Sequence, residues 1–364
     1  MTKKNDIPMA FETLAVHSGP GPDPATGASS PAIHQSSSFA FRDTGHAANV
    51  FALKEKGFIY SRVTNPTVMA LEEKIAALEG GKGATCTSSG LSASLLAAYT
   101  LMTPGDEFIA SQKIYGGTGS QFRDSFKRAF GWTGRFVDPG KNDAFKAALS
   151  DKTRFIFMES LSNPEGVIPD MEAIARIAED AGIPLIVDNT VATPILLRPF
   201  EYGADVVVHS LTKFMAGHGT TVGGAIIDAG HFDWGREPGR FPMLTEPEPS
   251  YHGVVYTEQF GRAAFVARCR TVCQRNTGSV LSPLSSFLLL QGLETLPLRM
   301  ERHSQNALRV AQFLEGHPAV DWVSYPGLES HPQHHLARRY FAHGYGAILG
   351  FGIKGGLEAG KQLI

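Results

Sequence analysis

The chain has 364 residues, of which 43% are hydrophobic and 19% are charged, a globular composition with room for two or three domains. Its formal net charge is -2 at pH 7 and it has no long block of Lys or Arg, so electrostatic binding of nucleic acid or of a membrane surface is excluded as a leading function. The N-terminal segment lacks the apolar core of a secretory signal, and no run of roughly eighteen apolar residues occurs. We therefore expect a cytoplasmic protein with a small-molecule partner.

The three cysteines, Cys86, Cys269 and Cys273, are too few for a disulfide framework. Cys269 and Cys273 are close enough to share a helix face, but no His or further Cys stands beside them at metal-ligand spacing. We predict buried thiols and no metal site.

The first sixty residues are rich in Gly, Pro and Ser (SGPGPDPATGASSPAIHQSSS) and show no sustained periodicity. We predict an extended arm over residues 1–60 that contacts a neighbouring subunit. From Thr67 the stretch TVMALEEKIAALEGG has apolar residues at helical spacing and ends in glycines, which predicts a helix. SSGLSASLLAAYTLM predicts a second helix that opens at a Ser-Gly turn.

Short apolar runs then alternate with helical patterns. The runs are DEFIAS, RFIFMES, PLIVDN, ADVVVHS and GGAIID, and MEAIARIAEDAG is an amphipathic helix between two of them. Near-continuous apolar strands separated by helices indicate a mostly parallel sheet with helices on both faces. The predicted fold class is therefore α/β, with a large domain over residues 61–281.

From Ser282 the pattern changes to a long helical stretch, SPLSSFLLLQGLETLPLRMERHSQNALRVAQFLEGH, followed by two strand-like runs, VDWVSYPG and AILGFGIKGG. This pattern predicts a smaller α+β domain over residues 282–364. It stops at Ile364 within the helical pattern LEAGKQLI and without a C-cap, so we expect this domain to be incomplete.

Polar residues follow three of the apolar runs directly. Glu159 follows RFIFM, Asp188 follows PLIV, and Ser210, Thr212 and Lys213 follow ADVVVH. Because ligands of open α/β sheets bind at the carboxyl ends of the strands, we expect these side chains to share one crevice.

The residue types in this crevice suit one cofactor. The helix opening at Ser89 and Gly90 offers backbone N–H groups and the positive end of the helix dipole to a phosphate. A desolvated amine at Lys213 is able to form a Schiff base, and a buried Asp188 is able to pair with a protonated ring nitrogen. Together these parts match the requirements of pyridoxal phosphate.

Each part also has a simpler interpretation. A lone Lys213 is more often a solvated surface residue, Asp188 fits a turn, and Ser-Ser-Gly fits a helix cap. Ser210 and Lys213 satisfy the short S-x-x-K pattern of serine acyl-transferring enzymes, although no K-T-G or S-D-N accompanies it. The glycines from Gly217 to Gly224 are spaced differently from a dinucleotide loop. The prediction therefore depends on the combination.

The order of the motifs SSG, YGGT, SNP, VDNT and HSLTKF resembles the Cys/Met-metabolism branch of the fold-type I pyridoxal-phosphate enzymes. YSRVTNPT and YPGLESHP extend the resemblance over essentially the whole chain. It implies a fold-type I transferase with pyridoxal 5'-phosphate as cofactor, a seven-stranded, mostly parallel sheet, and a homodimer with shared active sites, usually paired into a homotetramer.

The resemblance also implies a role for each matched position. Lys213 would be the Schiff-base lysine, Asp188 would hold the ring nitrogen protonated, and Tyr115 would stack on the ring and assist proton transfer. Asn163 would orient a cofactor oxygen and the substrate carboxylate. The implied phosphate ligands are Ser89, Gly90, Ser210 and Thr212, joined by Tyr60 and Arg62 from a neighbouring subunit.

Within the branch, two features favour O-acetylhomoserine sulfhydrylase. Gly117 stands in YGGT where the methionine lyases have a cysteine, and residues 239–256 (GRFPMLTEPEPSYHGVVY) resemble an insertion typical of the sulfhydrylases. The expected reaction replaces the acetate of O-acetyl-L-homoserine with sulfide or a thiol, giving homocysteine or methionine. A methionine or cystathionine γ-lyase is one alternative. A catalytically impaired pyridoxal-phosphate-binding subunit is another, because no carboxylate-binding arginine motif of the family occurs before Ile364.

Overall fold

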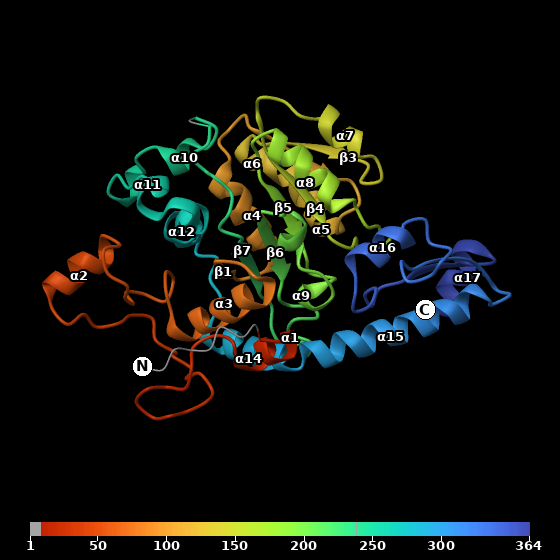
Figure 1. Cartoon of the computed structure of the whole chain (residues 1–364), viewed down its shortest axis with the longest axis horizontal. Coiled ribbons are helices and arrows are strands. Elements are labelled where there is room, and N and C mark those ends of the chain that lie inside the picture. The colour runs from red at the N-terminus through yellow and green to blue at the C-terminus, as the bar shows by residue number, and fades with distance from the viewer. Residues whose placement is uncertain (1–8, 238) are drawn as a thin grey trace.

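The protein is described by a computed structural model that covers residues 9–237 and 239–364. A central sheet is enclosed by helices, with α2 (Thr44–Phe51) projecting at one end and the C-terminal helices at the other (Figure 1). The first part of the predicted arm, residues 1–8, lies outside the described residues.

The central sheet has seven strands in the order β1-β7-β6-β5-β4-β2-β3. β7 runs antiparallel to both of its neighbours, and the remaining pairs are parallel, which confirms the predicted mostly parallel seven-stranded sheet. The strands are β1 (Gly83–Thr87), β2 (Glu107–Ser111), β3 (Thr133–Val137), β4 (Thr153–Glu159), β5 (Leu185–Asp188), β6 (Val206–Ser210) and β7 (Gly224–Asp228).

Two of these strands, β1 and β3, did not appear in the sequence prediction. β1 consists of small residues and threonines (GATCT), and β3 (TGRFV) is an edge strand whose residues are partly exposed. Neither carries the apolar run by which the five predicted strands were recognised, so pairing with neighbours determines their conformation.

Helices cover both faces of the sheet. Val207 of β6 packs into a core cluster with Leu71 of α3 (Pro66–Glu79). Val206 and Val208, which point to the other face, pack into a second cluster with Leu96 of α4 (Gly90–Leu101). Because successive strand side chains alternate between two covered faces, the first three positions of β6 are all apolar.

The other helices of this part are α5 (Gly116–Ser120), α6 (Phe126–Phe130), α7 (Asn142–Ala147), α8 (Met171–Asp180), α9 (Thr193–Leu196), α10 (Pro242–Thr245), α11 (Tyr256–Phe260), α12 (Ala264–Arg268) and α13 (Arg275–Thr277). Short 3-10 or π-helical segments cover Gln121–Ser125, Pro199–Tyr202, Pro249–Tyr251, Gly261–Ala263 and Cys269–Gln274. None of the helices in the part of the chain that the structure describes is long and apolar enough to cross a membrane.

The N-terminal region contains regular structure that the sequence pattern did not predict. α1 (Phe11–His17) packs against the body of the protein: Ala15 is fully buried, and Lys74 Nζ donates to the carbonyl oxygens of Ala15 and Val16 at 2.9 and 3.0 Å. The helix is only seven residues long and its periodicity is too short to stand out from the surrounding Gly, Pro and Ser.

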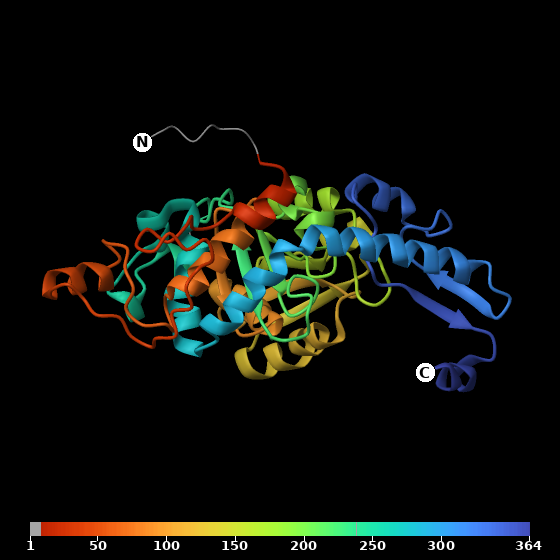
Figure 2. The ribbon, with the colours of Figure 1, turned by 90° about the horizontal axis from the view of Figure 1, so that it is seen from below.

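The long helical stretch after Ser282 is two helices, α14 (Pro283–Glu294) and α15 (Leu296–Glu315). Pro297 lies in the first turn of α15, where its missing N–H has no helical partner to lose. β8 (Val320–Ser324) and β9 (Gly350–Ile353) form a two-stranded antiparallel sheet beside α15, with α16 (His334–Tyr340) and α17 (Gly356–Leu363) at the same end of the molecule (Figure 2).

Candidate active site

The carboxyl ends of β4, β5 and β6 meet at one edge of the sheet. Glu159 and Asp188 are direct partners in the β4–β5 register, and Ser210 ends β6 beside them. A cavity of about 660 Å³ opens at this edge. Eight of the ten residues predicted for the site line it: Ser89, Gly90, Tyr115, Asn163, Asp188, Ser210, Thr212 and Lys213.

The N-terminus of α4 forms one wall of the cavity. Ser89 is its N-cap, with Oγ accepting the N–H of Ser92 at 3.1 Å, so the cap interpretation of this serine holds. Gly90 follows, and a Cβ at this position would lie 2.7 Å from Cβ of Ser210. The absence of a side chain lets the helix terminus sit directly against the end of β6, with its positive dipole end at the cavity.

Asp188 ends β5 at the floor of the cavity. One carboxylate oxygen accepts the N–H of Thr190 at 2.9 Å, and the Thr190 hydroxyl in turn accepts the N–H of Ser210 at 2.8 Å. Burial raises the pKa of Asp188, although the hydrogen bonds from Thr190 and the charge of His209 act in the opposite direction. A carboxyl group in such surroundings is stabilised as an anion by a positively charged partner in the cavity.

Lys213 lies in the turn that follows β6. Its N–H donates to the carbonyl of Ser210 at 3.3 Å, and the hydroxyl of Thr212 bridges to Gly223, donating to its carbonyl at 3.2 Å and accepting its N–H at 3.1 Å. The Lys213 side chain is exposed at the cavity. Ser210 ends a strand instead of opening a helix, which is unlike the helical S-x-x-K arrangement of serine acyl-transferring enzymes.

Glu159 connects two loops of the site. One of its carboxylate oxygens accepts the N–H of Tyr115 at 2.6 Å, and the other accepts the N–H of Asn163 at 2.9 Å. Burial, followed by the charge of Asp188, raises the pKa of Glu159 to about 8. The sequence had marked Glu159 only as an acid at a strand end.

Tyr60 and Arg62 do not line the cavity. Tyr60 is 43% exposed, and the Arg62 guanidinium lies 5.4 Å from the centre of its ring. Nη1 of Arg62 donates to the carbonyl oxygen of Arg275 at 2.8 Å. Within one chain these two residues are therefore not brought to Lys213.

Several lining residues were missed by the sequence reasoning. Thr190, Arg299, His303 and Ile348 all line the cavity. Arg299 and His303 are four residues apart and share a face of α15, but their segment indicated only a helix and gave no sign of what that face contacts.

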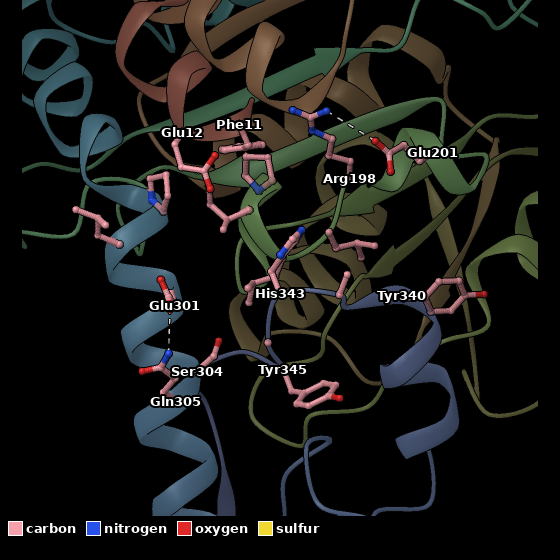
Figure 3. Close-up of a pocket in the computed structure, with 18 of the residues that line it drawn as sticks. Phe11, Glu12, Arg198, Glu201, Glu301, Ser304, Gln305, Tyr340, His343 and Tyr345 are labelled. Carbon is pink, nitrogen blue, oxygen red and sulfur yellow. Dashed lines mark hydrogen bonds and ion pairs between the residues drawn. The ribbon is translucent and has the colours of Figure 1, made fainter. Parts of the chain in front are cut away.

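A second cavity of about 680 Å³ lies on the other side of α15 (Figure 3). Glu301 and Ser304 line it from that helix, while Phe11 and Arg198 line it from the opposite wall. The Arg198 guanidinium lies 4.9 Å from the centre of the Phe11 ring. None of the residues predicted for the active site lines this cavity, so the candidate site remains at the strand ends.

The cysteine prediction is confirmed in that Cys86, Cys269 and Cys273 are buried free thiols. Burial raises the pKa of Cys269 and of Cys273, which keeps both in the protonated form. Over residues 9–237 and 239–364, no group of three or more His, Cys, Asp or Glu side chains is arranged to hold a metal ion.

Comparison with protein-family models identifies the family of this chain. The family described as Cys/Met metabolism PLP-dependent enzyme matches residues 12–364. The chain belongs to this family. The predicted resemblance is confirmed, and with it the dependence on pyridoxal phosphate (PLP) that defines the family.

The most similar relatives include sulfhydrylases. The chain is 50% identical over 355 residues to Sulfhydrylase FUB7 of Gibberella moniliformis, with 97% of this chain and 82% of the relative covered. It is 46% identical over 362 residues to the O-acetyl-L-homoserine sulfhydrylase of Leptospira meyeri, covering 97% and 81%. A crystal structure of an O-acetylhomoserine (thiol)-lyase from Campylobacter jejuni, with pyridoxyl-lysine monophosphate at its position 205, is 39% identical with a TM-score of 0.91 and covers 95% of this chain and 86% of that one.

The residues of the cavity fit PLP. The α4 terminus at Ser89 and Gly90 faces the cavity, Asp188 is a part-buried carboxyl that accepts the N–H of Thr190, and Lys213 brings an amine to the same space. A phosphate, a ring nitrogen that carries a proton and an aldehyde are the three groups that these residues complement.

Proposed function

We propose that this protein is a PLP-dependent O-acetyl-L-homoserine sulfhydrylase, which exchanges the acetate of O-acetyl-L-homoserine for sulfide or a thiol. The products are L-homocysteine, or methionine from methanethiol, together with acetate. The observation that carries the proposal is the convergence of Lys213, Asp188 and the α4 terminus in one cavity of a Cys/Met-metabolism PLP enzyme. The sulfhydrylase relatives, at 46% and 50% identity, support this reaction within the family.

PLP, when bound, supplies an aldehyde that links to amines and a ring that withdraws electrons from the carbon next to the linked amine. In the proposed roles Lys213 Nζ would form that link in the resting protein and would be released when the substrate amine replaces it. The freed amine would then move a proton to and from the substrate carbon. Asp188 keeps the ring nitrogen protonated, and Tyr115 covers the ring.

The remaining residues have binding roles in the proposal. Asn163 orients the ring oxygen and the substrate carboxylate. The phosphate is held by the α4 terminus and the β6 end, through Ser89, Gly90, Ser210 and Thr212. These groups donate hydrogen bonds to an anion that is never released during turnover, so they position the reacting carbon without taking part in proton transfer.

We also propose the assembly and the domain boundaries. Tyr60 and Arg62 would complete the phosphate site of a neighbouring subunit in a homodimer, paired into a homotetramer, because within their own chain they lie away from the cavity. Residues 1–60 form the arm, 61–281 the PLP-binding domain and 282–364 the small domain, in a cytoplasmic protein. Gel filtration with multi-angle light scattering tests the oligomer, and restoration of activity on mixing Arg62→Ala with Lys213→Ala subunits tests whether sites are shared.

The decisive experiment measures the absorption spectrum of the purified PLP-loaded protein and its products from O-acetyl-L-homoserine. We expect a visible band from the lysine-bound cofactor, a spectral change on adding substrate, and homocysteine only when sulfide is present. Lys213→Ala should lose the band and the turnover, whereas Lys127→Ala, which alters an exposed lysine on α6, should keep both. Formation of a keto acid and ammonia without sulfide, at a rate equal to that of replacement, would instead identify a γ-lyase.

A further inference from the structure

In the turn that carries Lys213, the carbonyls of Phe214 and Met215 accept no N–H from the described backbone of the turn itself. Within the turn, the N–H of Ala216 donates to the carbonyl of Leu211 at 3.0 Å and the N–H of Gly217 donates to the carbonyl of Lys213 at 2.9 Å. The carbonyls of Phe214 and Met215, directly after the lysine, are directed toward α15. Buried carbonyls need donors, so the partner of these two matters for the conformation of the turn.

Arg299 of α15 supplies the donors. Its Nη1 donates to the carbonyl of Phe214 at 2.6 Å, and its Nη2 donates to the carbonyl of Met215 at 3.4 Å and to that of Gly292 at 2.7 Å. Its Nε donates to the hydroxyl of Thr295 at 3.2 Å, which fixes the plane of the guanidinium. A planar fork of this kind joins the Lys213 turn to the C-terminal end of α14 in one rigid arrangement.

Two glycines provide the space for this arrangement. A Cβ on Gly217 would lie 2.5 Å from Cζ of Arg299 and closer still to its Nη1. A Cβ on Gly292 would lie 3.0 Å from the carbonyl carbon of Ala216 and closer to its oxygen. The guanidinium therefore fits between the turn and α14 only because both positions lack a side chain.

A second contact from the same helix supports the turn. His303, one helical turn after Arg299, places its ring 5.6 Å from the ring of Phe214, and both α15 residues line the active-site cavity. The helix thus holds the residue after Lys213 through its carbonyl and through its side chain. Burial lowers the pKa of Arg299. Its hydrogen bonds go to three main-chain carbonyls and to the hydroxyl of Thr295.

From these contacts we infer that Arg299 is a positioning residue for the reactive lysine: it fixes the Lys213 turn from α15 and so sets where the amine lies in the cavity. The inference rests on the proposed function for its kinetic consequence, but the contact itself requires only that Lys213 holds the cofactor. Arg299 acts through the backbone of Phe214 and Met215 and transfers no proton.

The test compares Arg299→Met and Arg299→Lys with Arg309→Met, which alters an exposed arginine on the same helix. All are purified with PLP, and kcat and KM for O-acetyl-L-homoserine are measured with sulfide. We expect kcat of Arg299→Met to fall by about 10- to 100-fold, the range for a reacting group displaced by up to about 1 Å, with KM changed less than about 3-fold. Arg299→Lys should recover part of the loss, because one ammonium reaches one carbonyl but does not span two.

Two readouts do not depend on turnover. The pH midpoint at which the absorption band of the lysine-bound cofactor changes should shift in Arg299→Met and stay unchanged in Arg309→Met. Amide hydrogen exchange of residues 211–217 in the cofactor-free protein should speed up at least about 10-fold in Arg299→Met, because the turn loses its carbonyl partners.

The outcomes separate the two proposals. The inference would be overturned if Arg299→Met and Arg299→Lys both matched Arg309→Met in kcat, in the spectral midpoint and in hydrogen exchange. That result would leave the proposed sulfhydrylase reaction intact. A shifted midpoint and faster exchange in Arg299→Met, combined with a wild-type protein that makes no homocysteine, would support the positioning role and refute the proposed reaction. If Arg299→Met does not fold, the same comparison with Arg299→Lys decides.

Discussion

Replacing Gly224 with alanine is expected to disturb the phosphate end of the active site from β7, a strand that does not line the cavity. Gly224 is the first residue of β7 and pairs with Thr87 of β1 on one side and with Ser210 of β6 on the other. A methyl group on Gly224 would lie 2.5 Å from the carbonyl carbon of Ser89 and 2.5 Å from Oγ1 of Thr87, and closer still to the carbonyl oxygen of Ser89. The Thr87 hydroxyl already donates to that oxygen at 2.9 Å, so neither neighbour has a flexible end that could yield.

The magnitude follows from the distances. Ordinary contact with a Cβ begins near 3.4 Å, so Ser89 must retreat by about 1 Å to accept the methyl group. A displacement of about 1 Å at a positioning group costs on the order of 100-fold in kcat/KM, which corresponds to about 2.7 kcal/mol. The same overpacking should lower the free energy of unfolding by about 1–3 kcal/mol.

The assay titrates the cofactor-free protein with PLP and then measures kcat/KM with O-acetyl-L-homoserine and sulfide. Gly224→Ala should bind PLP more weakly and lose activity, while Gly360→Ala should match the wild type, because nothing lies within 4 Å of a Cβ built on Gly360. If Gly224→Ala kept both its PLP affinity and its kcat/KM, the close contact between β7 and the Ser89 turn would not position the phosphate site.

Three further substitutions test the fold and its charges. Burial raises the pKa of Asp228 to about 7, so the folded state favours the neutral carboxyl and the wild type loses stability as the pH rises from about 4 through 7. In urea unfolding, the free energy of unfolding of Asp228→Asn should therefore rise relative to that of the wild type between pH 4 and 8, by at most about 4 kcal/mol. Glu72→Ala leaves Arg270, 2.7 Å away, buried without its carboxylate and should cost about 3–5 kcal/mol, part of which a second Arg270→Met substitution restores. Phe108→Ala removes a ring stacked 5.0 Å from Phe155 and should cost about 3–5 kcal/mol in the same unfolding assay, whereas a loss below about 1 kcal/mol would mean that the core closes over the gap.

The sheet was largely predictable because burial on both faces leaves a local signature. β4, β5 and β6 each contain an unbroken apolar run (FIFM, LIV and VVV), and each ends in a polar residue. That pattern alone placed Glu159, Asp188 and Ser210 at one edge of a parallel sheet. β1 and β3 carry no such signature, because small residues and an edge position remove the apolar run.

The residues of the candidate site were predictable when they directly follow a strand or begin a helix. Arg299 and His303 come from a helix almost ninety positions after Lys213, and the sequence contains no local pattern that links them to it. Tyr60 and Arg62 were reached only through the resemblance to a family, and their contact with a site remains a prediction about the assembly. Residues that act across long separations become visible only when the packing of whole elements is known.

The packing of the Lys213 turn explains why the sequence after the lysine is so rich in glycine and threonine. Its glycines are spaced differently from a dinucleotide loop, and two of them make room for a specific group: Gly217 for the guanidinium of Arg299 and Gly224 for the carbonyl of Ser89. Thr212 ties the turn to Gly223 by two hydrogen bonds. The lysine itself is the long, flexible part of the site, because a flexible stem of four carbon atoms separates its backbone from its amine. A reactive group on so mobile a side chain benefits most from a backbone that does not move, and the contacts of residues 211–217 with α15 and of Thr212 with Gly223 hold that backbone.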